Sequence, residues 1–557
     1  MSNSIATFIH YNMDQLVLPM DFSDLIPEDH VARVVNDMVE MVDEDLFYAP
    51  YKGGGRSAYH PKMMTKIILY AYTQKLYSCR DIAKSLREHL PMMWLAARQT
   101  PDFRTINRFR SERMKDIIEP LFTSLIQLLL DQNYITMDNY FLDGTKIEAN
   151  ANRYTFVWKK SVQKYKERLQ DKLEELFAHI EETIDSDNQQ VENDQGENKR
   201  VTSEQLREAV TQVEKQANQA EQALHDEQDP VLKKEKKAEA RHWRQLHKKL
   251  NTDYLPRLER YEDQLATFGD RNSFSKTDRD ATFMRMKEDH MKNGQLKPGY
   301  NVQAGTENQF IVGYSIHQRP TDTRCLIPHL RMLEERQLPF PKKLIADAGY
   351  GSEPNYLYIA ENEWDALIPY HTMRKEESRV YRNDPWKVQN WTYLEHDDTY
   401  ICPNNRRVTF RYYRKRTDAY GYERDFKIYE CEDCTGCPFK TDCTKAKGNR
   451  QIHYNPVYEE GKSKMKRALD TEEGAKTYRK RKTEVESVFG HIKGNRSFRR
   501  FHLRGLDKVN IEFGLIAIAH NFLKQAKTIR LFQEEINRSS ETKSLKRLIN
   551  VTSGFSF

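Results

Sequence analysis

The sequence predicts a multidomain α/β protein in which a helical N-terminal domain precedes a mixed sheet. At 557 residues the chain is too long for one hydrophobic core, and about two to four domains are expected. Apolar residues recur at helical spacing up to about residue 132. Beyond that point, β-branched and aromatic runs alternate with helical patterns, which is typical of strands and helices in one sheet-containing domain.

The first 132 residues contain several amphipathic segments separated by short turns. Pro61 opens one predicted helix, and Ser78 is placed as the N-cap of the next. The stretch PDFRTINRFRSER then favours a helix-turn-helix-like module that binds DNA. The side chains expected to face a phosphate backbone are Arg104, Asn107, Arg108 and Arg110. A plain helical bundle with a solvated basic face explains the same pattern, and both interpretations remain open.

Residues 135–149, ITMDNYFLDGTKIEA, predict a strand that carries Asp143 at or near its end, where Gly144 interrupts the pattern. A carboxylate in an apolar strand is costly unless it is paired or binds a metal ion. Asp143 is therefore a candidate functional residue. Asp138 is its rival, but it lies where the pattern still leads into the strand.

Residues 157–269 are highly charged and almost free of glycine. Apolar residues keep three-and-four spacing over 162–180 and again over 206–224, and Thr202 with Gln205 fits a capping box. The pattern predicts an antiparallel helical hairpin of the coiled-coil type, to which residues 242–265 could add a third helix. Its charges are expected to be solvated, although such an arm could also dimerise or reach along DNA.

Strand signals resume after residue 272. Two β-type runs joined by a turn at 305–308 predict a hairpin, and a helix follows. The segment KKLIADAGYGS then predicts a short buried strand that delivers Asp347 at its C-terminal end. Ligands and substrates of α/β sheets usually bind at that end of the strands. Asp347 is thus the second candidate.

Residues 478–504 form the densest basic run of the chain. An apolar stripe seats a predicted helix on a core, and Glu486 falls near Arg479, Lys482 and Lys493 on the adjoining face. A metal-binding carboxylate beside phosphate-binding cations suits phosphodiester chemistry. A salt-bridged amphipathic helix is the plainer interpretation.

The order of these elements suggests a shared site. Asp143 on the first strand, Asp347 on a later parallel strand and Glu486 on a closing helix can converge at one edge of a mixed sheet. Three carboxylates can hold two divalent cations roughly 4 Å apart. One cation activates a water or a 3′-hydroxyl, and the other stabilises the leaving oxygen.

Three short motifs resemble those of bacterial insertion-sequence DDE transposases and occur in the same order. They are LDGTK around Asp143, ADAGY around Asp347 and VESVFGHIK around Glu486. That family has an RNase H-like catalytic core, the fold of retroviral integrases. The resemblance is strongest to the insertion-sequence eleven-eighty-two group. Lys493 stands seven residues after Glu486, as in a Tyr-Arg-Glu-Lys signature, whereas Tyr478 and Arg481 are each shifted by one position from that signature.

The resemblance implies a DNA transposase that binds the terminal inverted repeats of its element, cleaves there and transfers 3′ ends to target DNA. It implies two Mg²⁺ or Mn²⁺ ions on Asp143, Asp347 and Glu486 and a homodimer on double-stranded DNA. Sequence-independent phosphate contacts are expected from Lys482, Lys493, Arg496, Arg499 and Arg500. Two alternatives are a sequence-specific DNA-binding regulator with an inactive core and a metal-dependent nuclease without strand transfer.

Five of the seven cysteines cluster. Cys431, Cys434, Cys437 and Cys443 read C-x2-C-x2-C-x5-C, and Cys402 is a fifth candidate. Tetrahedral Zn²⁺ takes four thiolates, so a structural zinc on four of the five is predicted. An iron–sulfur cluster would place its fourth cysteine sooner. Free thiols in a loop are the remaining interpretation.

These patterns divide the chain into five parts. They are a helical domain at 1–132; a catalytic core at 133–156, 270–370 and 456–527; a helical insertion at 157–269; a Cys-rich zinc-binding insertion at 371–455; and a tail at 528–557.

Charge and hydropathy indicate the partner and the compartment. A net charge of +6 conceals basic runs at 233–249 and 479–504, which suggest a polyanionic partner. The mean hydropathy is −0.85, with no apolar run long enough to span a membrane and no signal-peptide pattern. We expect a cytoplasmic bacterial protein that is nucleoid-associated when DNA-bound and has no membrane partner.

Overall fold

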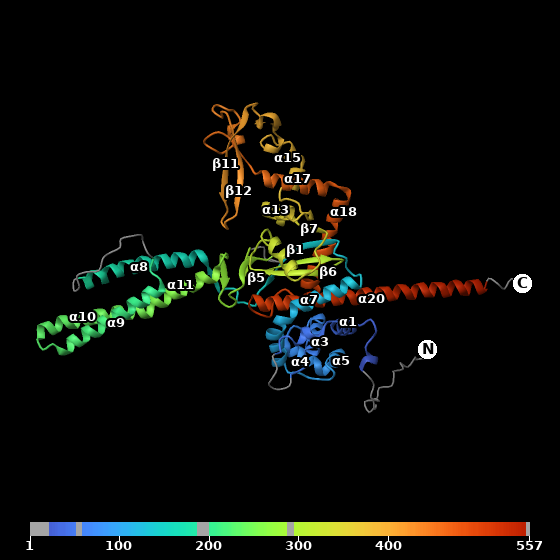
Figure 1. Ribbon diagram of the computed structural model, residues 1–557, viewed down its shortest axis with the longest axis horizontal. Coiled ribbons are helices and arrows are strands. Elements are labelled where there is room, and N and C mark those ends of the chain that lie inside the picture. The colour runs from blue at the N-terminus through green and yellow to red at the C-terminus, as the bar shows by residue number, and fades with distance from the viewer. Residues whose placement is uncertain (1–21, 52–57, 186–199, 287–293, 553–557) are drawn as a thin grey trace, which may run out of the picture.

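The computed structural model describes residues 22–51, 58–185, 200–286 and 294–552. Helices gather at the N-terminal end, a mixed sheet lies at the centre, and two excursions leave that sheet in different directions (Figure 1). This arrangement confirms the predicted α/β class with a helical N-terminal region. No helix in the described ranges is both long and apolar enough to cross a membrane.

The N-terminal region is built around α3, which spans Pro61–Thr73 and is buried along its whole length. As predicted, Pro61 begins α3 and Ser78 caps α4 by accepting a hydrogen bond from the backbone of Arg80. The other elements of this region are η1 (Phe22–Leu25), α1 (Val31–Glu40), α2 (Glu44–Tyr48), α4 (Cys79–Glu88), α5 (Leu90–Leu95), α6 (Phe103–Arg108), η2 (Phe109–Arg113) and α7 (Met114–Asp131).

The central sheet has strand order β4-β5-β1-β7-β8, and β6 also pairs with β5. β1 runs antiparallel to β5 and parallel to β7, so the sheet is mixed. Its strands are β1 (Asn139–Glu148), β4 (Thr282–Arg285), β5 (Leu296–Glu307), β6 (Phe310–His317), β7 (Lys343–Ala346) and β8 (Asp365–Leu367).

The β5–β6 hairpin turns later than its sequence predicts. Asn308 and Gln309 carry φ angles of 50° and 64°, as a two-residue hairpin turn requires, whereas Gly305 stays inside β5. A Cβ atom on Gly305 would lie 1.8 Å from Cζ of Tyr140. The glycine therefore serves a close approach within the sheet, which the sequence pattern cannot distinguish from a turn.

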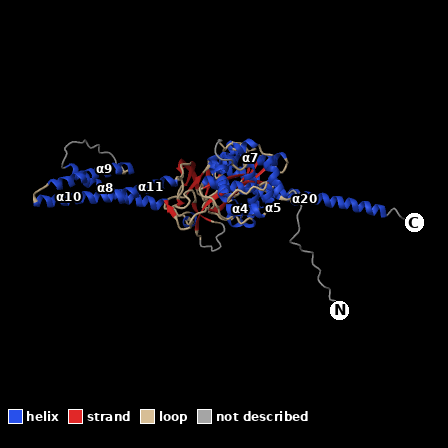
Figure 2. Ribbon diagram, turned by 90° about the horizontal axis from the view of Figure 1, so that it is seen from below, coloured by secondary structure: helices blue, strands red, loops and turns tan. Residues whose placement is uncertain are grey.

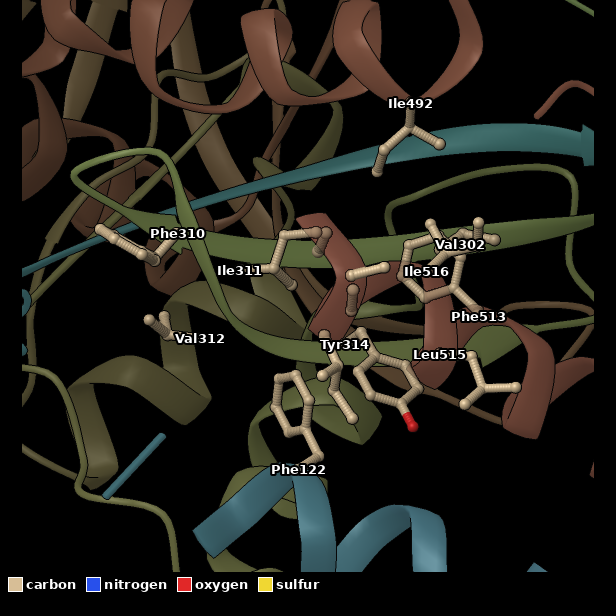
Figure 3. Packing of buried hydrophobic residues seen from close by; sticks show 14 of the residues in the cluster. Phe122, Val302, Phe310, Ile311, Val312, Tyr314, Ile492, Phe513, Leu515 and Ile516 are labelled. Atoms are coloured by element: carbon tan, nitrogen blue, oxygen red, sulfur yellow. The ribbon is translucent and has the colours of Figure 1, made fainter. Parts of the chain in front are cut away.

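One hydrophobic core joins the N-terminal helices to the sheet. α20 (Leu506–Thr552) packs against α3, α7 and β6. Phe122 of α7, Tyr314 of β6 and Phe513 of α20 meet there, with the rings of Phe122 and Tyr314 5.0 Å apart and perpendicular (Figure 3). Two further helices are α12 (Leu326–Glu335), which packs against β6, and α13 (Glu353–Glu361), which packs against α12 and against a later helix, α17 (Pro456–Asp470).

The helical insertion forms an arm that projects away from the sheet (Figures 1 and 2). It contains α8 (Lys159–Asp185), α9 (Ser203–Asp226), α10 (Pro230–Lys249), η3 (Leu250–Tyr254) and α11 (Leu255–Phe268). The capping box of Thr202 and Gln205 is confirmed at the start of α9. The arm has its own apolar core, and β2 (Phe156–Trp158) pairs with β3 (Ser273–Ser275) at its root.

The segment after β8 contains an antiparallel sheet that the sequence analysis did not predict. Its strand order is β13-β12-β11-β10-β9. The strands are β9 (Thr392–Leu394), β10 (Thr399–Ile401), β11 (Arg407–Thr417), β12 (Glu423–Cys431) and β13 (Gln451–Tyr454). Short helices accompany it, namely α14 (Met373–Glu376), α15 (Arg379–Arg382) and α16 (Lys440–Cys443).

Irregular helices return the chain from this sheet to the centre. α17 (Pro456–Asp470) and α18 (Glu472–Arg481) lead into the π-helical turn η7 (Lys482–Glu486), then α19 (Ser487–Gly490) and a second π-helical turn, η8 (His491–Asn495). π-helical turns inside α-helices are frequent at functional sites.

Candidate active site

Arg481 connects two of the predicted carboxylates. Its Nη1 donates to Oδ2 of Asp143 over 3.2 Å, and its Nη2 donates to Oε1 of Glu486 over 3.0 Å. Burial lowers the pKa of Arg481, but Asp143, Tyr478, Asp347 and Glu486 together raise it above its usual value. The guanidinium therefore lies in the field of all three candidate carboxylates.

Asp143 lies within β1 rather than at the end of a strand. β1 continues through Gly144 to Glu148 because β5 pairs with it along this length. The side chain of Asp143 is 6% exposed. Gly144 lies close to other side chains, and a Cβ atom there would displace the side-chain ends of Asp322 and Gln303. This glycine therefore continues the strand and leaves space for the Asp322 carboxylate.

Asp347 follows β7 directly, as predicted. Leu142 and Ala346 are paired neighbours on the parallel strands β1 and β7, so Asp143 and Asp347 occupy corresponding next positions on the two strands. Oδ1 of Asp347 accepts a hydrogen bond from the backbone N–H of Gly349 over 2.8 Å, which caps η4 (Ala348–Tyr350). This cap fixes the carboxylate at the strand end.

Glu486 ends η7, and its side chain is 47% exposed. Uninterrupted α-helical spacing predicts Arg479, Lys482 and Lys493 beside Glu486. The π-helical turns at 482–486 and 491–495 change that spacing, and Arg481 lies beside Glu486 instead. Lys493 is 9% exposed, which contradicts its predicted place on a solvated phosphate-binding face.

A buried polar network beside the carboxylates was not predicted. The hydroxyl of Tyr350 donates to Oε1 of Gln303, whose Nε2 donates to Oδ1 of Asp322 over 2.8 Å. Burial, followed by the charges of Asp322, Asp143 and Asp347, raises the pKa of Tyr350 well above its usual value. The sequence signal for this network is that Asn301 and Gln303 alternate with the apolar residues Tyr300, Val302 and Ala304 of β5.

No group of three or more His, Cys, Asp or Glu side chains is arranged to hold a metal ion in the part of the chain that the structure describes. The chemistry of the three carboxylates nevertheless suits Mg²⁺ or Mn²⁺, which prefer oxygen ligands. In the described arrangement, the positively charged Arg481 guanidinium lies between Asp143 and Glu486, where a metal ion would otherwise lie.

Two predicted DNA-binding arginines are structural. Arg110 is 4% exposed, and its Nη1 donates to the carbonyl of Tyr77 over 2.7 Å and to the hydroxyl of Tyr72 over 3.2 Å. Arg496 is 2% exposed, and its carbonyl accepts from the hydroxyl of Tyr77 over 2.9 Å. Tertiary packing between distant segments buries both side chains, so neither faces a phosphate backbone.

The other predicted DNA-binding residues are exposed, namely Arg104, Arg108, Lys482, Arg499 and Arg500. Arg108 pairs with Glu112, and Arg500 donates to the carbonyls of Ala149 and Ala151. Their contacts with DNA stay a prediction.

The five clustered cysteines line one small cavity and form no disulfide. These residues are Cys402, Cys431, Cys434, Cys437 and Cys443. The sulfur of Cys434 accepts a hydrogen bond from the backbone of Arg450 over 3.4 Å. The thiols are close together but are not arranged as a metal-ligand group within the described residues, so the structure does not support the zinc prediction.

Two family models match the chain. The first, Transposase DDE domain, covers residues 401–526, and the second, Transposase domain (DUF772), covers residues 20–112. The matches support a DDE transposase. No curated protein and no solved structure matches the chain. The DDE match contains Glu486, whereas Asp143 and Asp347 lie outside both matched ranges. Assignment of the chain to the eleven-eighty-two group of these transposases stays a prediction.

Proposed function

We propose that this protein is a DDE transposase that binds the terminal inverted repeats of its insertion sequence, hydrolyses phosphodiester bonds there and joins the freed 3′ ends to target DNA. The observation that carries the proposal is the placement of Asp143, Asp347 and Glu486 around one guanidinium. Neighbouring parallel strands supply the two aspartates, and a later helical turn supplies the glutamate. This is the arrangement that an RNase H-like core implies.

In this proposal, Asp143, Asp347 and Glu486 hold two Mg²⁺ or Mn²⁺ ions. When bound, such ions generate the attacking hydroxide or 3′-alkoxide and stabilise the leaving oxygen. Arg481 pairs with Asp143 and Glu486 and offsets part of their negative charge. If metal ions were held by these carboxylates, Arg481 would have to release at least one of them, and a freed guanidinium is well suited to bind a phosphate of the DNA.

One experiment separates this proposal from its two alternatives. Purified protein is incubated with Mg²⁺ and a duplex that carries the element ends, together with a target plasmid. A transposase yields cut ends and joined products. A regulator with an inactive core shifts the duplex without cutting it, and a nuclease cuts without joining. The mass of the protein–DNA complex tests the predicted homodimer.

A further inference from the structure

We propose that a basic groove on the arm binds the sugar-phosphate backbone of duplex DNA that flanks the cleavage site. This α10 groove has a volume of about 980 Å³ and lies between α9 and α10. Its cationic lining is Lys233, Lys237, Arg241, Arg244 and Lys248, and Glu221 is the acidic residue among its lining. The inference rests on the proposed function, because that function identifies the DNA as the duplex beside the cleaved element end.

The five cations follow one face of α10. Their spacing of four, four, three and four residues places them in a line, about 22 Å long at 1.5 Å per residue. Trp243 and Leu246, on another face, are buried in the core of the arm. The apolar residues on that other face pack α10 into the arm, so the exposed cations are not needed to hold the helix in place.

Most of these cations are not neutralised by the arm. Arg244 pairs with Glu221, but no ion pair involves Lys237, Arg241 or Lys248 in the described residues. Elsewhere in the arm, opposite charges do pair, as in Lys166 with Glu262 and Arg207 with Glu259. The unpaired positive charge gathers in the groove, where a polyanion would release counterions on binding.

The arm holds this groove at a defined distance from the sheet. α10, η3 and α11 follow one another without a loop from Pro230 to Phe268, and Figures 1 and 2 show them leading outward from the root. At 1.5 Å per residue, Lys248 and Lys233 lie about 30 and 50 Å along the helices from Phe268. At about 3.4 Å per base pair, the groove reaches DNA roughly 9–15 base pairs from the root of the arm.

The test compares two duplexes that carry the element end. The short duplex extends about 5 base pairs beyond the cleaved bond, and the long duplex extends about 25. At about 3.4 Å per base pair, the short duplex is too short to contact the groove and the long duplex is long enough. The groove variant is Lys237→Glu with Arg241→Glu. The control is Lys172→Glu with Lys215→Glu, which makes the same charge change at exposed residues of α8 and α9 outside the groove.

We expect the groove variant to bind the long duplex at least about tenfold more weakly than wild type, with a salt-dependence slope smaller by about 2. Binding and Mg²⁺-dependent nicking of the short duplex should match wild type, and the control variant should match wild type on both duplexes.

Three results would overturn the inference: unchanged binding of the long duplex, an equal loss on both lengths, or an equal loss in the control. A change in self-association without a change in DNA binding would instead identify the groove as a contact between two copies, and it would also overturn the inference. Absence of nicking by wild type contradicts the proposed function alone, because the length-dependent binding is measured separately.

Discussion

Nη1 of Arg481 lies 3.2 Å from Oδ2 of Asp143, although the two residues are 338 positions apart in the chain. Asp143 is buried in the middle of β1, where an unpaired carboxylate would be strongly destabilising. The ion pair therefore has two consequences: it stabilises the apo protein, and it sets a competition between the guanidinium and the proposed metal ions.

Replacement of Asp143, Asp347 or Glu486 by Ala should lower cleavage of element-end DNA by about three orders of magnitude or more, because each change removes a proposed metal ligand. Affinity for the DNA should change little. Cleavage rates with Mg²⁺ and gel-shift affinities measure the two effects. Asp138→Ala is the matched control, because Asp138 is half-buried and pairs with Lys342, and it should retain much of the activity. Full activity of Glu486→Ala would show that Glu486 is only part of a salt-bridged surface.

Arg481→Ala should lower the free energy of unfolding by about 3–5 kcal/mol without metal, because it removes the ion pair between Arg481 and the buried Asp143 carboxylate. Millimolar Mn²⁺ should restore part of that loss by neutralising the same carboxylates. Urea unfolding with and without Mn²⁺ measures both effects. Arg479→Ala, a change at a neighbouring exposed arginine, should cost less than about 0.5 kcal/mol. Equal stabilities of the two variants would disprove the role of the ion pair.

Arg110→Ala should destabilise the N-terminal helices by about 2–4 kcal/mol, because it removes buried charge-assisted hydrogen bonds to Tyr77 and Tyr72. Arg104→Ala, at an exposed position of α6, should leave stability unchanged and weaken DNA binding slightly on every sequence. Thermal unfolding and gel shifts compare the two. If Arg110→Ala were as stable as wild type but bound DNA more weakly, Arg110 would be a phosphate contact, as the sequence predicts.

Stability should fall as the pH drops from about 6.5 toward 3, because of His520. Burial, followed by the charges of His491, Arg496 and Lys524, lowers the pKa of His520 to about 3, although its hydrogen bond to the carbonyl of Gln309 opposes the shift. In this window the unfolded chain binds a proton that the native protein does not, so unfolding is favoured by about 1.4 kcal/mol per pH unit. Between pH 7 and 5, wild type should lose about 2 kcal/mol more than His520→Gln. Parallel pH profiles would contradict this assignment.

Metal analysis tests the zinc prediction. If four of the five clustered cysteines bind structural zinc, the purified protein should contain about one Zn²⁺ per chain, and Cys434→Ser should destabilise the β9–β13 sheet locally. Hydrogen exchange over residues 392–454 would detect that change. A folded and active protein without zinc would reject the prediction.

Local patterns predicted the parts of the site that depend on neighbouring residues. Asp347 at the end of β7 and the N-terminal capping of α9 at Thr202 both follow from short-range hydrogen bonds and apolar runs, which leave a clear mark in the sequence. The positions of Asp143 and Glu486 on a strand and a helical segment followed in the same way.

The failures arose where distant segments pack together. Arg110 and Arg496 belong to basic runs, yet contacts with residues 73–77 bury them. Arg481 lies beside Glu486 because the π-helical turn at 482–486 changes the helical spacing, and no residue pattern predicts that turn. The β9–β13 sheet was missed because its longest strand, β11, is rich in exposed charged and tyrosine side chains rather than alternating apolar ones.

The long separation between Asp143 and Arg481 also has a consequence during synthesis. In the described residues β1 pairs with the later strands β5 and β7, and the hydrogen bond from Arg481 to the buried aspartate cannot form until a further 338 residues have been added. At about 5–20 residues per second, that interval lasts roughly 20–70 s. A nascent or truncated chain that ends before Glu486 therefore cannot assemble the three carboxylates, so the proposed capacity to cut DNA should arise only in chains whose translation has passed Glu486.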